Sequence, residues 1–255
     1  MDVWEQDFYY DKAGKGSLYV KHKGMQILIQ IANKSEFVLD MGCGDGTRLN
    51  IIAKNKSAIG VDISTKAIKR AKTKYPKLKF VQADLEKLPF KNNSFDLVYS
   101  AFVLEHVNNP ERVLKQALRV LKSNGHLLLM SPNYGAPNRA CPVNKSSRII
   151  KLMKGLGSDL LRFFRKSNSL QWQKVRPMAT SKVYWSDWDT TVEPYLGSLL
   201  VFLTRNKLKI IEYSCVWEEE FTHAKLCQKV ARLLSKIGIY PFKYWGPHLV
   251  VLAKK

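Results

Sequence analysis

Three aspartates and a run of glycines are the residues of this chain whose types and spacing could do chemistry together. Residues 40–46 read DMGCGDG, with Asp40 followed by glycines at alternate positions. Glycine lets a ligand approach the backbone where a Cβ atom would clash. Asp62 and Asp84 each follow another short apolar run. A carboxylate can accept hydrogen bonds from both hydroxyls of a ribose, and an acid at the next strand end can meet an adenine amine, so the set indicates a nucleoside-like ligand.

The elements that must position these acids alternate between strand and helix from residue 17 to residue 131. The predicted strands are short apolar runs with helical patterns between them, at residues 37–40, 58–62, 79–82, 95–100 and 125–131. Near-continuous apolar strands are typical of a parallel sheet that helices cover on both faces. Since parallel strands end at one edge of the sheet, we expect the three acids to converge in one crevice.

The second half of the chain interrupts this alternation and then resumes it. From residue 193 a helix, a strand at 209–217, a helical stretch and a last strand at 247–255 follow. We predict one doubly wound α/β domain over residues 1–255 with two insertions. Residues 132–192, after the fifth strand, are expected to form a substrate cap, and residues 218–246 form a second helical insertion.

Five segments, in this order, resemble the successive motifs of class I S-adenosylmethionine-dependent methyltransferases: VLDMGCGDG, GVDIS, VQADLEKLPF, SFDLVYSAFVLEHV and LKSNGHLLLMSPN. The resemblance covers roughly residues 36–133 and is weaker over 193–255. It implies a Rossmann-like seven-stranded sheet in the order 3-2-1-4-5-7-6, with the last strand antiparallel. It also implies S-adenosylmethionine as the methyl donor, with S-adenosylhomocysteine as the product.

The resemblance further implies a cofactor site at the strand ends. Asp40 and the glycines would face the methionine part, Asp62 would hold the ribose hydroxyls, and Asp84 would accept from the adenine amine. Apolar residues beside these acids would pack near the adenine, and the end of the fourth strand would line the floor near the sulfonium. The complete predicted set is Asp40, Gly42, Gly44, Asp62, Ile63, Asp84, Leu85, Ser100 and Ala101.

His106, in the segment LEHV after the fourth strand, is the candidate general base. An imidazole can take a proton near neutral pH, which would help a hydroxyl acceptor. The alternative is that His106 packs against, or caps, the next helix. The segment after the fourth strand lacks the Asn/Asp-Pro-Pro-Tyr/Phe pattern of amino methylation, and the four scattered cysteines form no CxxC pair. We therefore expect O-, N- or C-methylation of a small molecule and no metal.

The charge of the chain bears on the acceptor. Forty-two Lys and Arg against 21 Asp and Glu give a formal charge of +21, which attracts anions. The leading prediction is an anionic, sugar or lipid-linked small molecule. An RNA methyltransferase is the alternative, although no separate RNA-binding module is recognisable. A nicotinamide-dependent oxidoreductase is less favoured, because the glycine spacing is GxGxG and not GxGxxG and because of Asp84.

Residues 146–166 combine an apolar stripe, including Ile149, Leu152, Met153 and Leu156, with basic residues on the opposite side. Such a helix can make peripheral contact with an anionic membrane. The simpler interpretation is a cap helix that packs this stripe on the core and leaves its charges in solvent. The N-terminal residues lack the apolar stretch of a signal peptide and no run is long enough to cross a bilayer, so a cytoplasmic location is expected.

Overall fold

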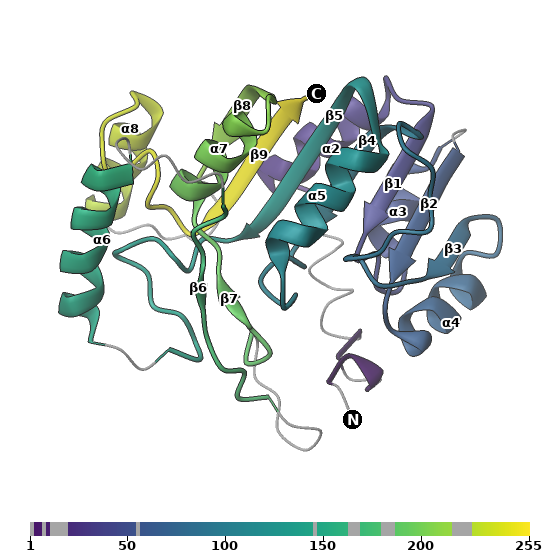
Figure 1. Cartoon of the computed structure of the whole chain (residues 1–255), viewed down its shortest axis with the longest axis horizontal. Helices are drawn as coiled ribbons and strands as arrows, with labels where there is room; N and C mark the ends of the chain where they lie inside the picture. Colours follow the sequence, from purple (N-terminus) through teal and green to yellow (C-terminus); the bar gives the residue numbers. More distant parts are fainter. Residues whose placement is uncertain are drawn as a thin grey trace.

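A computed structural model describes residues 3–6, 9–10, 20–54, 57–144, 147–162, 169–179, 187–215 and 226–255. A seven-stranded sheet in the order β3-β2-β1-β4-β5-β9-β8 runs through its centre (Figure 1). The strands are β1 (Phe37–Met41), β2 (Ser57–Asp62), β3 (Lys79–Gln82), β4 (Phe95–Ala101), β5 (Leu121–Pro132), β8 (Lys209–Ser214) and β9 (His248–Lys254). Since β9 is the last strand and runs antiparallel to β5 and β8, the predicted order 3-2-1-4-5-7-6 is confirmed.

The strands are apolar on both sides because the sheet has a hydrophobic core on each face. Successive residues of β1 point to opposite faces, so Val38 belongs to one buried cluster and Leu39 to the other. In β5, Leu127 and Leu128 divide between the clusters in the same way. Burial on both faces is the reason that these strands read as continuous apolar runs in the sequence.

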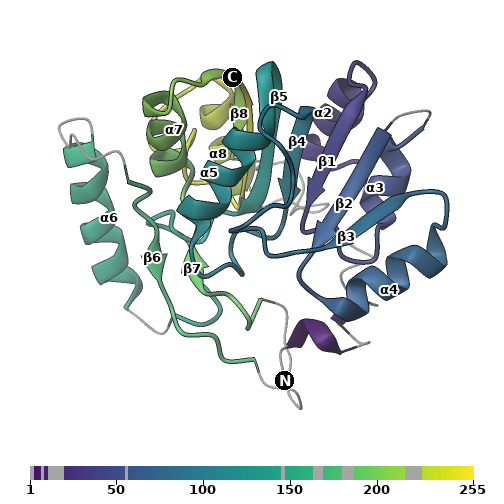
Figure 2. The same cartoon turned by 45° about the vertical axis from the view of Figure 1, so that its right-hand side comes forward.

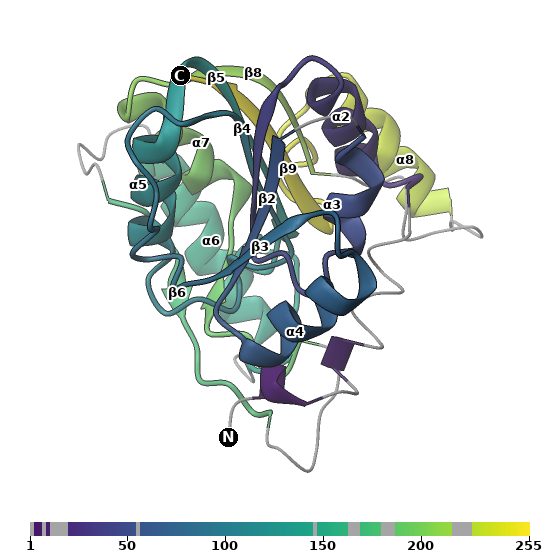
Figure 3. The ribbon, with the colours of Figure 1, turned by 90° about the vertical axis from the view of Figure 1, so that its right-hand side faces the viewer.

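Helices complete the layers on both sides of the sheet. The helices α5 (Pro110–Val120) and α7 (Leu196–Arg205) cover one face, while α2 (Lys23–Ala32) and α3 (Thr47–Ile52) cover the other (Figure 3). The helix α4 (Thr65–Lys74) begins after Ser64, because the Ser64 side chain accepts from the N–H of Ala67 and caps the helix. Pro110 occupies the first turn of α5, and the Asn109 side chain caps it.

The remaining elements fall in the two segments predicted as insertions and in the N-terminal segment. The first insertion holds α6 (Arg148–Arg162) and the hairpin of β6 (Gln173–Lys174) and β7 (Val192–Glu193). The second holds α8 (Leu226–Lys236). The short helix η1 (Val3–Glu5) lies beside α4 (Figure 2), where the Glu5 carboxylate accepts from the backbone N–H groups of Thr65 and Lys66.

The expectation that the apolar stripe of α6 packs on the core is wrong for most of its described residues. Leu152 packs against the core, but Ile149, Met153 and Leu156 are exposed. Instead of these residues, α6 presents Leu152 and the buried Asp159 to the body of the protein. Phe163 and Phe164, the end of the predicted stripe, lie outside the described residues. Among the described helices, none is long and apolar enough to cross a membrane.

Candidate active site

The glycine loop after β1 folds back onto the end of β2. The backbone N–H groups of Gly42 and Cys43 both donate to the carbonyl of Val61, at 2.8 and 2.9 Å. Gly42 has a φ of +83°, and a Cβ atom at this position would collide with the side chain of Val103. The sequence therefore needs glycine here for both conformation and space, and the loop backbone stays bare at the carboxyl edge of the sheet.

Asp62, at the end of β2, orders this loop through its carboxylate. Its Oδ2 accepts from the N–H of Gly44 at 2.9 Å, and its Oδ1 accepts from the N–H of Ser64 at 3.0 Å. Burial raises the pKa of Asp62, and these backbone hydrogen bonds act in the opposite direction. The next residue, Ile63, is apolar yet 53% exposed. The end of β2 thus presents acceptor lone pairs next to an open apolar surface.

Asp40, at the end of β1, is completely buried, and neither carboxylate oxygen has a hydrogen-bond partner. Burial raises the pKa of Asp40 to about 6, while the nearby side chains of Arg48 and Tyr99 lower it in part. The Arg48 charge and the Tyr99 hydroxyl therefore offset only part of the cost of burying this carboxylate. The strands β1 and β2 pair in register as far as Met41 and Val61, so Asp40 and Asp62 lie at adjacent strand ends.

The third predicted acid lies at the same edge of the sheet but in solvent. The N–H of Ala83 donates to the Asp62 carbonyl at 3.0 Å, which holds the end of β3 next to the end of β2. Asp84 follows as an exposed residue whose Oδ1 accepts from the N–H of Glu86 at 2.8 Å. Its neighbour Leu85 is buried and belongs to the core.

Ser100 and Ala101, at the end of β4, are both buried. The Ser100 hydroxyl donates to the carbonyl of Met41 at 3.1 Å, and the Ala101 carbonyl accepts from the Arg48 guanidinium at 3.4 Å. These contacts join the end of β4 to the end of β1 and to α3, the two elements that flank the glycine loop. All nine residues predicted for the cofactor therefore lie at or just after the carboxyl ends of β1, β2, β3 and β4.

His106 lies between two buried carboxylates. Its Nδ1 is 3.2 Å from Oδ2 of Asp189, and its Nε2 is 3.7 Å from Oε1 of Glu105. Burial alone would lower the pKa of His106, but the carboxylates of Glu105, Asp189 and Asp187 outweigh it and raise the pKa. Burial raises the pKa of Glu105 to about 7. Protons can thus redistribute within this cluster near neutral pH.

Segments far apart in the chain assemble this acid–histidine cluster. Thr191 donates to the carbonyls of Glu105 and Val107, each at 2.8 Å, and so holds the strand end of the cap against the loop after β4. The Tyr134 hydroxyl bonds to the Asp187 carboxylate. Sequence reasoning named His106 but missed Glu105, Asp187 and Asp189; the acids flanking a tryptophan in SDWD were the available signal.

Two consecutive tyrosines join the glycine loop to this cluster. The Tyr10 ring is buried and lies at van der Waals distance from the position of a Cβ atom on Gly44. The Tyr9 ring is 5.2 Å from that of Tyr10. Burial raises the pKa of Asp189, against the effects of His106 and a hydrogen bond with Tyr9. The loop after β4 also approaches the glycine loop directly, since Val103 packs against Gly42 and its carbonyl accepts from the N–H of His106 at 2.9 Å.

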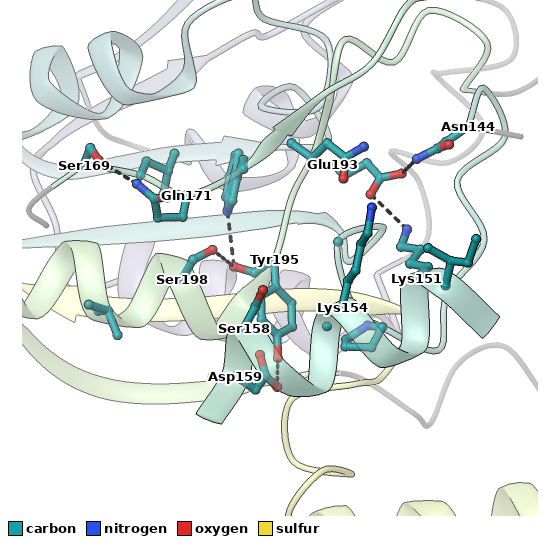
Figure 4. A pocket seen from close by; sticks show the side chains of 18 of the residues that line it. Asn144, Lys151, Lys154, Ser158, Asp159, Ser169, Gln171, Glu193, Tyr195 and Ser198 are labelled. Atoms are coloured by element: carbon teal, nitrogen blue, oxygen red, sulfur yellow. Dashed lines mark hydrogen bonds and ion pairs between the residues drawn. The ribbon is translucent and has the colours of Figure 1, made fainter. Parts of the chain in front are cut away.

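A pocket of about 440 Å³ lies in the cap between α6, the β6–β7 hairpin and α7 (Figure 4). Its buried acids are already satisfied. Glu193 accepts from the Lys151 ammonium at 2.9 Å and the Asn144 amide at 2.8 Å, and Asp159 accepts from the Tyr195 hydroxyl at 2.6 Å. Lys154 also lines the pocket and has no ion-pair partner within the described ranges.

Tyr134 connects this pocket to the acid–histidine cluster. Its hydroxyl bonds to Asp187, whereas its carbonyl accepts from the pocket residue Lys151 at 2.6 Å. Among the described residues, no group of three or more His, Cys, Asp or Glu side chains is arranged to hold a metal ion. The site therefore offers acids, one imidazole, bare loop backbone and a neighbouring cap pocket.

Comparison with known protein families matches the part of the chain that carries these strand ends. Residues 39–129 match a family model described as a methyltransferase domain. Over 110 residues the chain is 34% identical to a protein of Mycobacterium tuberculosis named "Probable S-adenosylmethionine-dependent methyltransferase", covering 42% of this chain and 40% of that protein. Over 102 residues it is 35% identical to the demethylmenaquinone methyltransferase of Renibacterium salmoninarum, covering 38% of this chain and 43% of that enzyme.

In both alignments the chain spans less than half the length of its curated relative. The fold extends the similarity. An S-adenosylmethionine-dependent methyltransferase from Mesorhizobium loti superposes with a TM-score of 0.56 at 17% identity, covering 92% of this chain and all of that structure. The matched segment contains the ends of β1 to β4, where the glycine loop and the three acids lie. Residues 39–129 thus match the methyltransferase domain family, and the chain has the fold of class I S-adenosylmethionine-dependent methyltransferases, whose cofactor is S-adenosylmethionine.

Proposed function

We propose that the protein transfers the methyl group of S-adenosylmethionine to a small-molecule acceptor positioned at His106. The observation that carries this proposal is the placement of His106 between Glu105 and Asp189, next to the glycine loop. When bound, the cofactor supplies a methyl group on a sulfonium, which is a good leaving group. Much of the remaining barrier is alignment of the acceptor and removal of its proton, and these are tasks for the protein.

The residues at the strand ends fit the cofactor. Asp40 offers a buried carboxylate without a partner, which suits the ammonium group of the methionine part, and Gly42 and Gly44 leave room for that part along the loop. Each Asp62 oxygen accepts one backbone hydrogen bond and keeps lone pairs for ribose hydroxyls. Ile63 offers an exposed apolar surface for the adenine ring.

Asp84 and the end of β4 complete the proposed cofactor site. The Asp84 carboxylate is exposed beside the end of β2 and can accept from the adenine amine. Leu85 fixes the turn that carries Asp84 by packing into the core. Ser100 and Ala101 are buried against the glycine loop and form the floor near the sulfonium.

His106 acts as the general base in this proposal. A neutral imidazole takes the proton of the acceptor hydroxyl or amine, and the carboxylates of Glu105 and Asp189 stabilise the imidazolium that results. Because these carboxylates raise the pKa of His106 above its ordinary value of 6.5, kcat/KM should rise with pH through a correspondingly higher value. Tyr9 and Tyr10 would cover the cofactor side of the site and limit access of water.

The acceptor is proposed to be an anionic, sugar or lipid-linked small molecule. Curated relatives include a demethylmenaquinone methyltransferase and, at 28% identity, a ubiquinone biosynthesis O-methyltransferase of Coxiella burnetii. The cap pocket is of small-molecule size and places Lys154 beside acids that are already paired, which favours an anionic group there. The RNA alternative draws its support from the +21 charge.

Release of S-adenosylhomocysteine in the presence of a panel of small hydroxylated and anionic acceptors tests this function. His106→Ala should lower kcat by roughly 10²–10⁴-fold with unchanged affinity for S-adenosylhomocysteine, since the imidazole moves the proton and does not hold the cofactor. His126→Ala is the matched control, because His126 lies on β5 in register with Leu97, away from the carboxyl edge of β4. Unchanged turnover of His106→Ala would refute the role of His106 as general base. Turnover with RNA and with none of the small molecules would show that the acceptor is RNA.

A further inference from the structure

The large hydrophobic side chains that are exposed on this protein are concentrated in two helices. Among the described residues, eleven of seventeen such side chains lie on α6, on α8 or just after α8. They are Ile149, Ile150, Met153, Leu156, Leu161, Leu226, Val230, Leu233, Ile237, Ile239 and Tyr240. Scattered exposed hydrophobic residues are normal on soluble proteins, but a concentration of this kind marks an interaction surface.

Their spacing makes each set a continuous stripe. Ile149, Met153 and Leu156 recur at helical intervals along α6, and Leu226, Val230 and Leu233 do the same along α8. The exposed fractions reach 73% at Ile149 and 77% at Leu226. Within the described part of the chain, the side chains of both stripes remain exposed.

Both helices lie at the same end of the molecule, beyond the edge strand β8 (Figure 1). They are on different sides of the sheet but are tied together, because the Tyr240 hydroxyl just after α8 donates to the Asp159 carboxylate of α6 at 3.3 Å. The exposed apolar residues of α6, of α8 and just after α8, together with Lys229, Arg232 and Lys236 of α8, are called the two-helix face below. Both stripes therefore belong to one end of the molecule.

The charge of the two-helix face decides between possible partners. On α6, Lys151 is paired with Glu193 and Lys154 lines the cap pocket, while the single acid, Asp159, is buried. The sequence of α8 contains Lys229, Arg232 and Lys236 and no acid. A second copy of the chain would bring positive charge against positive charge, in a protein that already carries +21. Apolar stripes flanked by basic residues instead match the interface of an anionic bilayer.

We propose that the two-helix face binds peripherally to anionic lipid membranes, with the apolar stripes inserted at the level of the head groups and the lysines and arginines against their phosphates. Binding of this kind combines buried apolar area with electrostatic attraction, so it weakens with added salt. The proposal goes beyond methyl transfer, and none of the residues proposed for the cofactor lies on α6 or α8. Lys154 of α6, which lines the cap pocket proposed for the acceptor, is left unchanged in the variants below.

Vesicle flotation of the full-length chain tests the proposal, with phosphatidylcholine vesicles that either contain or lack phosphatidylglycerol. We expect binding to the anionic vesicles alone. Lys229→Glu/Lys236→Glu and, separately, Met153→Ser/Leu233→Ser should each lower that affinity at least about tenfold, since each basic residue near the surface contributes about 1 kcal/mol and buried apolar area supplies the remainder.

Matched controls carry the same chemical changes elsewhere on the surface. Lys69→Glu/Lys72→Glu reverses two charges on α4, and Val20→Ser/Phe37→Ser removes two exposed apolar side chains far from α6 and α8. Both should bind vesicles as the wild type does, to within about twofold. Binding of S-adenosylhomocysteine should be unchanged in every variant, which separates this surface from the proposed active site.

Three results would overturn the proposal. The first is absence of vesicle binding by the wild type at low salt, and the second is an equal loss of affinity in the control variants. The third is a concentration-dependent dimer, seen by sedimentation, that Met153→Ser/Leu233→Ser disrupts while vesicles remain unbound. That last result would assign the two-helix face to contact between copies of the chain.

Discussion

The strand-end half of the site, built on β1 to β4, and the cap half, built on α6, β7 and α7, hold their carboxylates in different ways. In the strand-end half, Asp62 accepts from the backbone N–H groups of Gly44 and Ser64. In the cap, Asp159 accepts from side chains distant in the sequence, the Tyr195 hydroxyl at 2.6 Å and the Trp245 indole N–H at 3.2 Å.

The two halves therefore differ in which carboxylates can still accept a hydrogen bond from a ligand. Backbone donors and strand register position Asp40 and Asp62, so their side chains can keep unused acceptor capacity, as the unpartnered Asp40 does. In the cap, Asp159 and Glu193 are consumed by internal hydrogen bonds and ion pairs. Substitution of an acid should therefore affect mainly cofactor binding in the strand-end half and mainly stability in the cap.

The largest expected effect is that of Asp62→Ala on cofactor binding. The substitution removes the proposed ribose acceptor and also leaves the Gly44 N–H without its acceptor, which loosens the loop. We expect the affinity for S-adenosylhomocysteine, measured by calorimetry, to fall at least about 100-fold, since two charge-assisted hydrogen bonds are lost.

Asp96→Ala is the matched control for this change. The Asp96 carboxylate, at the start of β4, likewise accepts from two backbone N–H groups, those of Phe37 at 2.9 Å and Glu36 at 3.3 Å, but at the opposite edge of the sheet. The free energy of unfolding of Asp96→Ala should fall by an amount comparable to that of Asp62→Ala, while its affinity for S-adenosylhomocysteine stays unchanged. Equal affinities in the two variants would show that Asp62 is only a structural residue of the loop.

In the cap, Asp159→Ala should lower the free energy of unfolding by about 2 kcal/mol while cofactor affinity stays constant. The reason is that the Tyr195 hydroxyl and the Trp245 N–H are left buried without an acceptor. Urea denaturation with and without S-adenosylhomocysteine measures both quantities. Asp159→Asn keeps an acceptor oxygen and should recover part of the loss; a cap variant that abolished cofactor binding would end the distinction between the two halves.

The same contrast explains what the sequence could and could not predict. The positions of the strands, the glycine loop and the N-terminal cap of α4 depend on local patterns, namely apolar runs, glycines with positive φ and a capping serine, whereas the strand order was implied by the family resemblance. These signals are confined to a few neighbouring residues, so they can be read before folding. The roles of the nine cofactor residues and of His106 remain predictions.

The surroundings of His106 could not be predicted in the same way. Asp189 reaches the imidazole because Thr191 bonds to the loop after β4, a contact between residues 86 positions apart. No local pattern specifies such a pairing. The exposed stripe of α6 was misjudged for a related reason, since amphipathic spacing identifies an apolar face but not whether anything covers it.

The smallest expected effect is that of Asp40→Asn on stability, and its size should depend on pH. Burial raises the pKa of Asp40 from 3.8 to about 6 in the folded protein, so the folded state holds this proton more tightly than the unfolded state. The resulting stability is fully present below about pH 4 and is lost as the pH rises through about 6. The amide in Asp40→Asn cannot ionise, so this variant should retain that stability at higher pH.

Without cofactor, Asp40→Asn should therefore be more stable than the wild type by about 1 to 2 kcal/mol at pH 8, and the difference should shrink toward pH 4. The full pKa shift limits this difference in the free energy of unfolding to about 3 kcal/mol. The cost of burying an amide without hydrogen-bond partners lowers the difference further. Urea denaturation across this pH range measures the difference. Affinity for S-adenosylhomocysteine should fall about tenfold at the same time, because the proposed counter-charge of its ammonium group is removed. A pH-independent difference with unchanged affinity would mean that the buried carboxylate at the end of β1 is neither ionised nor used, and the strand-end half would then resemble the cap.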